Sequence, residues 1–249
     1  MTRGHLLVEF VGLPGAGKTT LASAVARRLA RRGLAVKNVG SLYPDTSWKV
    51  RARKMARGLR ETLLRPQSAY RSGLAVLASG QRSLVDAAKA LHNWLFISSV
   101  VEENGSGAHV VLLDEGVFQA LWSIGYSGRD GALAALLYDL YPLFPRPDLV
   151  VIVDVGPAIA AARLAARPFG GSRLERAPAD DPHAFVRAVQ VWQELRRFIE
   201  GLSTEPQGVD VATVDNNGEG VDANADALAT RIEHLWAGRR PVDGWARVS

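Results

Sequence analysis

Short apolar or alternating runs of residues recur along the chain, and longer stretches with apolar residues every three or four positions separate them. The short runs lie at residues 6–11, 34–39, 110–113, 149–155 and 209–214. Runs of this length are typical of strands, and strands apolar on both faces are typical of parallel sheets. The longer stretches predict helices at residues 20–32, 157–166, 182–202 and 221–236. Alternation of strands and helices indicates an α/β fold.

Residues 44–104 interrupt this alternation with a helical region that we expect on the substrate side of the domain. Breaks are expected at Pro66, Gly73 and Gly80, and the last part predicts one long amphipathic helix. The first part, residues 48–65, carries seven Lys and Arg residues against one acid. A basic helix in this place either contacts an anionic substrate or faces solvent. Both interpretations stay open.

A phosphate-binding loop (P-loop) follows the first run, because the pattern G-x-x-x-x-G-K-S/T is filled between strand and helix. Its residues are Gly12, Leu13, Pro14, Gly15, Ala16, Gly17, Lys18 and Thr19, with Thr20 next to it as a further nucleotide contact. Glycines let successive N–H groups turn inward around an anion, and the following helix adds its positive end. Lys18 should reach the β- and γ-phosphates of ATP, and the Thr19 hydroxyl should hold Mg²⁺.

A second chemical landmark is the acid pair after the run at residues 110–113. Asp114 comes directly after four apolar residues, at the strand end where open α/β sheets bind ligands. It is therefore expected to be a carboxylate of the Mg²⁺ site. Glu115 can be a general base, a substrate contact or a loop acid. Asp45, after the second strand, can act on a substrate hydroxyl or cap the next helix.

Two further groups of residues leave alternatives open. The first has near-helical spacing and lines either a pocket for a flat substrate or the core; it comprises Phe118, Gln119, Trp122 and Tyr126. The second is an arginine-rich segment at residues 167–181, predicted to be a lid that closes over the transferring phosphate, or else a surface loop. It contains or adjoins Arg163, Arg167, Gly170, Gly171, Arg173 and Arg176. Arg167 and Arg173 are the candidate catalytic residues of the lid, and Arg163 is a candidate nucleotide contact.

Composition narrows the function classes. The 249 residues carry a formal charge of +5 and a sequence pI of about 9.8, which suits an anionic substrate but does not by itself indicate nucleic acid. The chain has no cysteine, which excludes disulfides and thiol catalysis. The first apolar run is too short for a signal peptide or a membrane span, so we expect a cytoplasmic protein with no membrane partner. Four arginines near the end of the first helix, at residues 27, 28, 31 and 32, are expected to face solvent.

The chain resembles P-loop kinases of the nucleoside monophosphate kinase group and is most similar to thymidylate kinases. The matching pieces are GLPGAGKTT at 12–20, LARRGLAV at 29–36, LLDEG at 112–116, VIVDVGPAIAAARLAAR at 151–167 and VATVDNNGEGVDANADAL at 211–228. The resemblance implies a three-layer fold with five parallel strands in the order 2-3-1-4-5, helices on both faces, and a lid. It also implies ATP and Mg²⁺ at the loop and a purine pocket around Asp215–Asn217, with Asn216 as a candidate nucleotide contact. One domain at residues 1–238 with a tail at 239–249 is expected, and a homodimer stays open.

The sequence departs from that family at the acceptor. Thymidylate kinases usually carry Asp-Arg after the third strand, whereas this chain has Asp114–Glu115, and their Arg-Glu-Pro signature after the second strand is missing. An acid in place of an arginine would repel a monophosphate, so a nucleoside or another small hydroxyl compound is an open acceptor beside a nucleotide. The alternative function is a P-loop ATPase in which Glu115 activates water.

Overall fold

A parallel five-stranded sheet forms the centre of the computed structural model, which describes residues 4–42, 48–103, 107–144, 146–167, 174, 183–204, 208–218 and 220–239. Its strands are β1 (Leu6–Val11), β2 (Val36–Asn38), β3 (Val110–Leu113), β4 (Leu149–Asp154) and β5 (Asp210–Asp215). They pair in the order β2-β3-β1-β4-β5, which confirms the predicted fold class. Because all strands run the same way, their carboxyl ends meet at one edge of the sheet.

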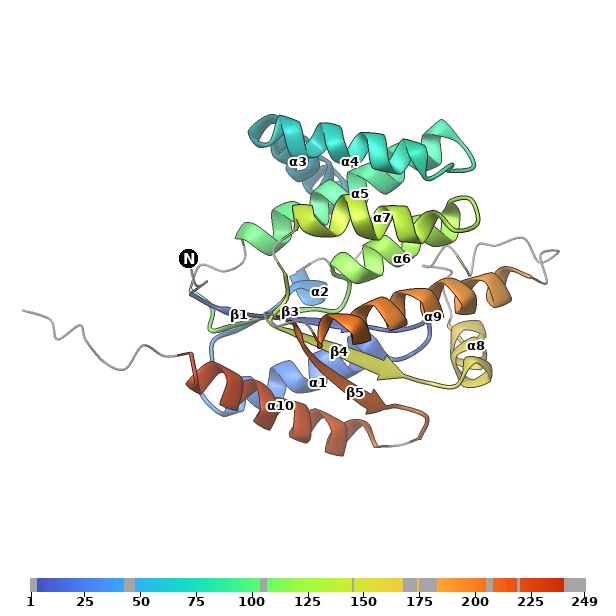
Figure 1. The fold of residues 1–249 in the computed structure, drawn as a ribbon. Helices are drawn as coiled ribbons and strands as arrows, with labels where there is room; N and C mark the ends of the chain where they lie inside the picture. The colour runs from blue at the N-terminus through green and yellow to red at the C-terminus, as the bar shows by residue number, and fades with distance from the viewer. Residues whose placement is uncertain are drawn as a thin grey trace, which may run out of the picture.

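Helices cover both faces of the sheet (Figure 1). One face carries α1 (Lys18–Arg31) and α10 (Val221–Ala237), and the other carries α6 (Val117–Ser127) and α9 (Ala184–Leu202). A further layer lies beyond α6 and contains α3 (Trp48–Leu64), α4 (Pro66–Ala78), α5 (Leu84–Glu103) and α7 (Ala132–Leu140). The short helices α2 (Val39–Leu42) and α8 (Pro157–Ala165) follow β2 and β4, and the 3₁₀ turn η1 (Tyr141–Leu143) follows α7.

The element boundaries differ from the predicted ones at a few points. The second strand is only three residues long, because the chain turns into α2 at Val39. The break at Pro66 is confirmed, with proline in the first turn of α4 where its missing N–H does no harm. Gly73 lies inside α4 and breaks nothing, whereas Gly80 adopts a positive φ of 68° in the turn before α5. Helix α7 was not predicted from the pattern.

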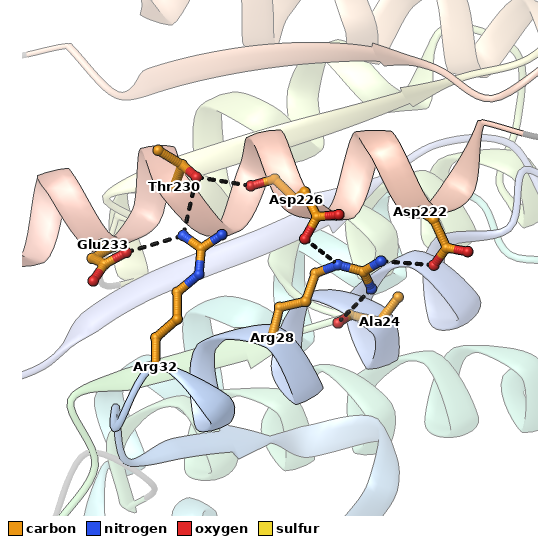
Figure 2. Close-up of polar contacts among 7 residues, drawn as sticks. All are labelled: Ala24, Arg28, Arg32, Asp222, Asp226, Thr230 and Glu233. Carbon is orange, nitrogen blue, oxygen red and sulfur yellow. Dashed lines mark hydrogen bonds and ion pairs between the residues drawn. The ribbon is translucent and has the colours of Figure 1, made fainter.

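Of the four arginines of α1 expected to face solvent, Arg27, Arg31 and Arg32 are exposed, and Arg28 and Arg32 also join α1 to α10 (Figure 2). Arg28 donates to Asp226 at 2.5 Å and to Asp222 at 2.7 Å. Arg32 donates to Thr230 and Glu233, both at 3.0 Å. The helix that starts at the P-loop is thereby fixed along its second half to the last helix of the domain.

None of the helices in the described ranges is long and apolar enough to cross a membrane.

Candidate functional site

The P-loop is held in shape by backbone approaches that only glycine permits. Gly15 and Gly17 have φ values of 89° and 90°, in the left-handed region. A Cβ on Gly15 would lie 3.0 Å from the carbonyl carbon of Ala160 and nearer still to its oxygen. A Cβ on Gly12 would lie 2.7 Å from the carbonyl oxygen of Val153. Strand β4 and helix α8 therefore pack directly against the loop, which places it at the carboxyl edge of the sheet as predicted.

Lys18 is the first residue of α1, and its side chain folds back over the loop. Its Nζ donates to the carbonyl oxygens of Gly12 at 2.9 Å and Leu13 at 3.1 Å. Burial lowers the pKa of Lys18 from 10.5 to about 8; the Glu115 carboxylate opposes this, Arg167 adds to it, and Asp114 also opposes it. At neutral pH the ammonium group is still mostly charged, and it lies beside the inward-turned backbone that an oxyanion would occupy.

Asp114 stands at the end of β3 with only 5% of its surface exposed, yet it lines the pocket described below. Helix α2 packs closely on its carboxylate, because a Cβ on Gly40 would lie 2.6 Å from Asp114 Cγ. Thr19 is exposed on the first turn of α1 and lines the same pocket. No cluster of three or more His, Asp or Glu residues that could hold a metal exists among the described residues. Asp114 and Thr19 suit Mg²⁺, which usually takes few protein ligands and completes its shell with phosphate and water.

A cavity of about 300 Å³ lies in front of these residues. One wall is the P-loop with Lys18, Thr19 and the acid pair, and Arg167 borders it from the end of α8. The opposite wall comes from α5 and α6; its residues are Asn93, Ile97, Gln119, Ala120, Trp122 and Ser123. The cavity therefore joins a phosphate-binding loop to a wall of two amides, a hydroxyl and an indole ring.

The tryptophan in that wall is fixed from behind. Trp122 Nε1 donates to the carbonyl oxygen of Ala188 at 3.2 Å, and its ring stacks on Tyr126 with centroids 5.3 Å apart. Gln119 and Trp122 thus belong to the pocket, whereas Phe118 and Tyr126 are buried in the core. Trp122 is also buried in the core, so it fits both interpretations, and the binding of a flat substrate there stays a prediction.

Asn216 is predicted from the resemblance to lie in a purine pocket. In the structure its side chain contacts the backbone of the P-loop. Its Nδ2 donates to the carbonyl oxygen of Ala16 at 2.6 Å, and its backbone N–H donates to Asp154 at 2.8 Å. The side chain is 4% exposed and is not part of the cavity lining. The structure therefore gives Asn216 a contact with the loop; a direct contact with the nucleotide remains a prediction.

Other predicted residues lie outside this cavity or outside the described residues. Thr20 and Arg163 do not line the cavity. Asp45, Arg173 and Arg176, and the Gly170–Gly171 pair of the predicted lid, lie outside the described residues. The described basic residues of α3 do not line the cavity either.

Sequence reasoning missed five residues that the structure brings to the site or directly behind it, namely Asn93, Ile97, Ala120, Ser123 and Glu9. Asn93 and Ile97 lie four positions apart on one face of the long helix α5, which carries several other polar residues, so the sequence held no signal that singled out Asn93. Glu9 is fully buried in β1, paired in register with Leu113 just before the acid pair, and accepts a hydrogen bond from the Phe118 N–H at 2.7 Å. A charged residue inside the central strand of a parallel sheet was the signal for it.

Comparison with known proteins places the chain near nucleotide kinases. No protein-family model matches it. It is 31% identical over 160 residues to a thymidylate kinase of Xylella fastidiosa (strain 9a5c), a match that covers 64% of this chain and 65% of that enzyme. It is 29% identical over 246 residues to a thymidylate kinase of Xanthomonas campestris pv. campestris (strain B100), across 98% of this chain and 92% of the relative.

Among solved structures, the chain is similar to a deoxyadenosine kinase from M. mycoides, with a TM-score of 0.56 and 12% sequence identity. The superposition covers 92% of this chain and all of that kinase. At such low identity the likeness concerns the fold alone: this chain has the three-layer fold of that nucleoside kinase, with the P-loop at the carboxyl edge of a five-stranded parallel sheet.

Proposed function

We propose that the protein is an ATP- and Mg²⁺-dependent kinase that transfers the γ-phosphoryl group to the hydroxyl of a small, uncharged, flat acceptor of the nucleoside class. The observation that supports this proposal most directly is that the P-loop and the wall from α5 and α6 line the same cavity. A volume of about 300 Å³ lies at the small end of the ~300–1,000 Å³ of ligand pockets. The space suits a compact acceptor beside the terminal phosphate.

In this proposal the phosphate side of the cavity supplies positioning and charge. Lys18 leaves its carbonyl partners to contact the β- and γ-phosphates, and Thr19 and Asp114 hold Mg²⁺. Phosphoryl transfer depends mainly on such positioning and electrostatic stabilisation, which Mg²⁺ supplies when bound by neutralising developing charge. Arg167 borders the cavity and extends this positive charge toward the transferring group. The rest of the lid, including Arg173, is proposed from the sequence alone.

The acceptor side has a different chemistry. Asn93 and Gln119 offer amide groups that both donate and accept hydrogen bonds, and Trp122 offers an indole ring. Nucleobases present planar rings with donors and acceptors along one edge, and they match such a wall. Glu115 is exposed beside the P-loop, where it can accept a proton from an acceptor hydroxyl. Its negative charge disfavours an acceptor that already bears a phosphate.

The relatives support transfer to an acceptor. Two are named thymidylate kinase and the structural neighbour is named deoxyadenosine kinase. An ATPase that activates water through Glu115 would have no use for the amide-lined wall. We therefore favour the kinase over the hydrolase.

The experiment is an acceptor screen. Purified protein with Mg²⁺ and ATP is incubated with thymidine, deoxyadenosine or thymidylate, and phosphorylated products are detected by mass spectrometry. We expect an acceptor-dependent product with a nucleoside and little ADP without one. Rapid acceptor-free release of ADP that is lost in Glu115→Gln would instead establish the hydrolase.

A charge reversal tests the acceptor class. Glu115→Arg restores the Asp-Arg pair usual in thymidylate kinases. The substitution should lower turnover of the nucleoside and raise turnover of thymidylate. Parallel changes for both acceptors would argue that Glu115 does not discriminate between them, and Gln119→Ala serves as a comparison that perturbs the wall without changing charge.

A further inference from the structure

Glu9 is an anomaly in the central strand. It lies in β1 between β3 and β4, with apolar neighbours along the strand, and none of its surface is exposed. Burial raises the pKa of Glu9 to about 8, although the amides of Phe118, Gln119 and Val117 favour the charged form. A buried carboxyl group of this kind costs folding free energy. The contacts of Glu9 indicate a role other than stability.

The carboxyl group of Glu9 contacts the start of α6. Its Oε1 accepts the Phe118 N–H at 2.7 Å and the Gln119 N–H at 3.4 Å. Gly116 lies directly on the same group, since a Cβ there would be 2.7 Å from each carboxyl oxygen. The other oxygen, Oε2, has no hydrogen-bond partner within the described chain. Glu9 therefore contacts the N-terminal end of α6 closely and accepts hydrogen bonds there through Oε1.

Helix α6 has no cap of its own. Its N-cap is Gly116, which has no side chain, and its first turn contains no acid. The N–H groups at a helix start need acceptors, and side chains just before the helix usually supply them. Here the acceptor comes from a strand 109 residues earlier in the chain.

The position of this contact connects the two sides of the site. Glu9 is three residues before Gly12, the start of the P-loop. Its partner in the β3 register is Leu113, the residue before Asp114. Gln119, whose N–H it accepts, lines the acceptor wall. One carboxyl group thus joins the P-loop strand, the end of β3 and the start of α6.

We propose that Glu9 is a positioning residue that sets the turn at residues 114–116 and the acceptor wall of α6 relative to the P-loop. The proposal rests on the kinase function proposed above. Glu9 touches neither nucleotide nor acceptor in this account. Its effect passes through the backbone of Gly116, Phe118 and Gln119 to the Mg²⁺ carboxylate and to the wall.

The test measures metal binding and stability side by side. Mn²⁺ is titrated into the protein with a non-hydrolysable ATP analogue and followed by its electron paramagnetic resonance signal. Glu9→Leu removes the acceptor oxygen, whereas Glu9→Gln keeps it. We expect the Mn²⁺ affinity of the analogue complex to fall about tenfold or more in Glu9→Leu, as for other groups that orient metal ligands. The melting temperature should change little, because removal of the costly buried carboxyl group offsets the loss of the acceptor for the Phe118 N–H.

Three further variants and readouts sharpen the test. Glu9→Gln should bind Mn²⁺ close to the wild type, and Gly116→Ala, which pushes on the carboxyl group from α6, should reproduce the loss. Amide exchange at Phe118 and Gln119 should quicken in Glu9→Leu. Val8→Ala is the matched control, because alternate residues of a strand face opposite sides of the sheet. It should lower the melting temperature and leave Mn²⁺ affinity unchanged.

The outcomes separate the two proposals. If the wild type binds Mn²⁺ with the analogue and Glu9→Leu binds it equally well, the positioning role is wrong and the kinase proposal stands. A Mn²⁺ loss that only follows a loss of melting temperature, as in an ordinary core mutant, also overturns the positioning role. A wild type that binds no Mn²⁺ with the analogue overturns the kinase proposal and this inference together.

Discussion

Replacing Gly40 by alanine should displace the carboxylate that we propose to hold Mg²⁺ while the fold stays intact. Gly40 lies in α2, and its Cα packs against the carboxyl group of Asp114. A Cβ at this position would lie 2.6 Å from Asp114 Cγ, with both carboxylate oxygens nearer still. Asp114 is 5% exposed, so the open side toward which its carboxylate can move is the cavity that it lines.

The size of the displacement follows from the geometry. Cβ atoms keep at least 3.0 Å from other heavy atoms and 3.4 Å in ordinary contact, so Cγ must move by roughly 0.4–0.8 Å and the two nearer carboxylate oxygens by more than that. Mg²⁺ demands near-ideal octahedral geometry with bonds of about 2.0–2.1 Å, and shifts of this size disturb it. Groups that orient a metal usually cost about 10–100-fold in metal affinity when disturbed. We expect Gly40→Ala to fall in that range.

The assay is the Mg²⁺ dependence of ATP turnover in Gly40→Ala, compared with Asp114→Asn. Both variants should need much more Mg²⁺ for half-maximal rate. Affinity for the metal-free nucleotide should change little, because the P-loop supplies that contact. Far-ultraviolet circular dichroism should remain that of the wild type, and alanine should even favour the helical backbone slightly.

Gly201→Ala is the matched control, since Gly201 lies in α9 and a Cβ there would meet nothing within 4 Å. It should raise stability by roughly 0.5–1 kcal/mol and leave the Mg²⁺ dependence unchanged. If Gly40→Ala keeps the wild-type Mg²⁺ dependence while Asp114→Asn loses it, the close packing of α2 on Asp114 does not matter for the metal. If neither variant changes it, Asp114 is not the Mg²⁺ carboxylate.

Three other substitutions give separate tests. Lys18→Met should abolish turnover and raise the melting temperature of the unliganded protein by roughly 2–4 °C, which is equivalent to about 1 kcal/mol. This gain in melting temperature should shrink as the pH rises from about 8 to 10.5, because Lys18 of the wild type then loses its proton in the folded state before it does so in the unfolded state. The free energy of unfolding of Glu9→Gln should rise relative to that of the wild type between pH 4.5 and about 8, by up to about 1.4 kcal/mol per pH unit, because Glu9 is ionised there only in the unfolded wild type. If urea unfolding shows the same pH dependence for both proteins across that window, the raised pKa is contradicted. Arg28→Ala should lower the melting temperature by loosening α1 from α10, less so in about 1 M salt, whereas exposed Arg27→Ala should have little effect at either salt.

Local sequence patterns predicted the part of the site whose residues are contiguous in the sequence. The P-loop needs glycines, a lysine and a threonine at fixed spacing, because one turn of backbone must surround an anion. Gly15, Gly17 and Lys18 accordingly share one turn between β1 and α1, and their contact with a nucleotide stays a prediction. Asp114 was placed by the same kind of reasoning, since a parallel strand delivers its next residue to the carboxyl edge. The strand order was predicted from the resemblance, because hydrophobic periodicity does not show which strands pair with each other.

Boundaries and one helix were harder to predict. Helix α7 packs on α4, α6 and α9 with one side, and its exposed side consists of Ala134, Ala135, Tyr138 and Asp139. Only one of these four residues is charged, so the helix lacked the polar stripe that marks an amphipathic helix. Gly73 was read as a break but lies within α4, where packing of the helix outweighs the small intrinsic cost of glycine. The lid at residues 167–181 stays a prediction.

The contacts that finish the site join residues far apart in sequence, and only the tertiary structure decided them. Asn216 holds Ala16 from 200 residues away, and Glu9 holds Phe118 from 109 residues away. Asn93 reaches the cavity only because α5 packs against α6. A residue's own sequence neighbourhood reports whether it is buried, through periodicity and composition, but not which group it meets there. That pairing depends on how separate elements pack. The sequence around Glu9 predicts burial, but only the packing of α6 against β1 makes the start of α6 its partner.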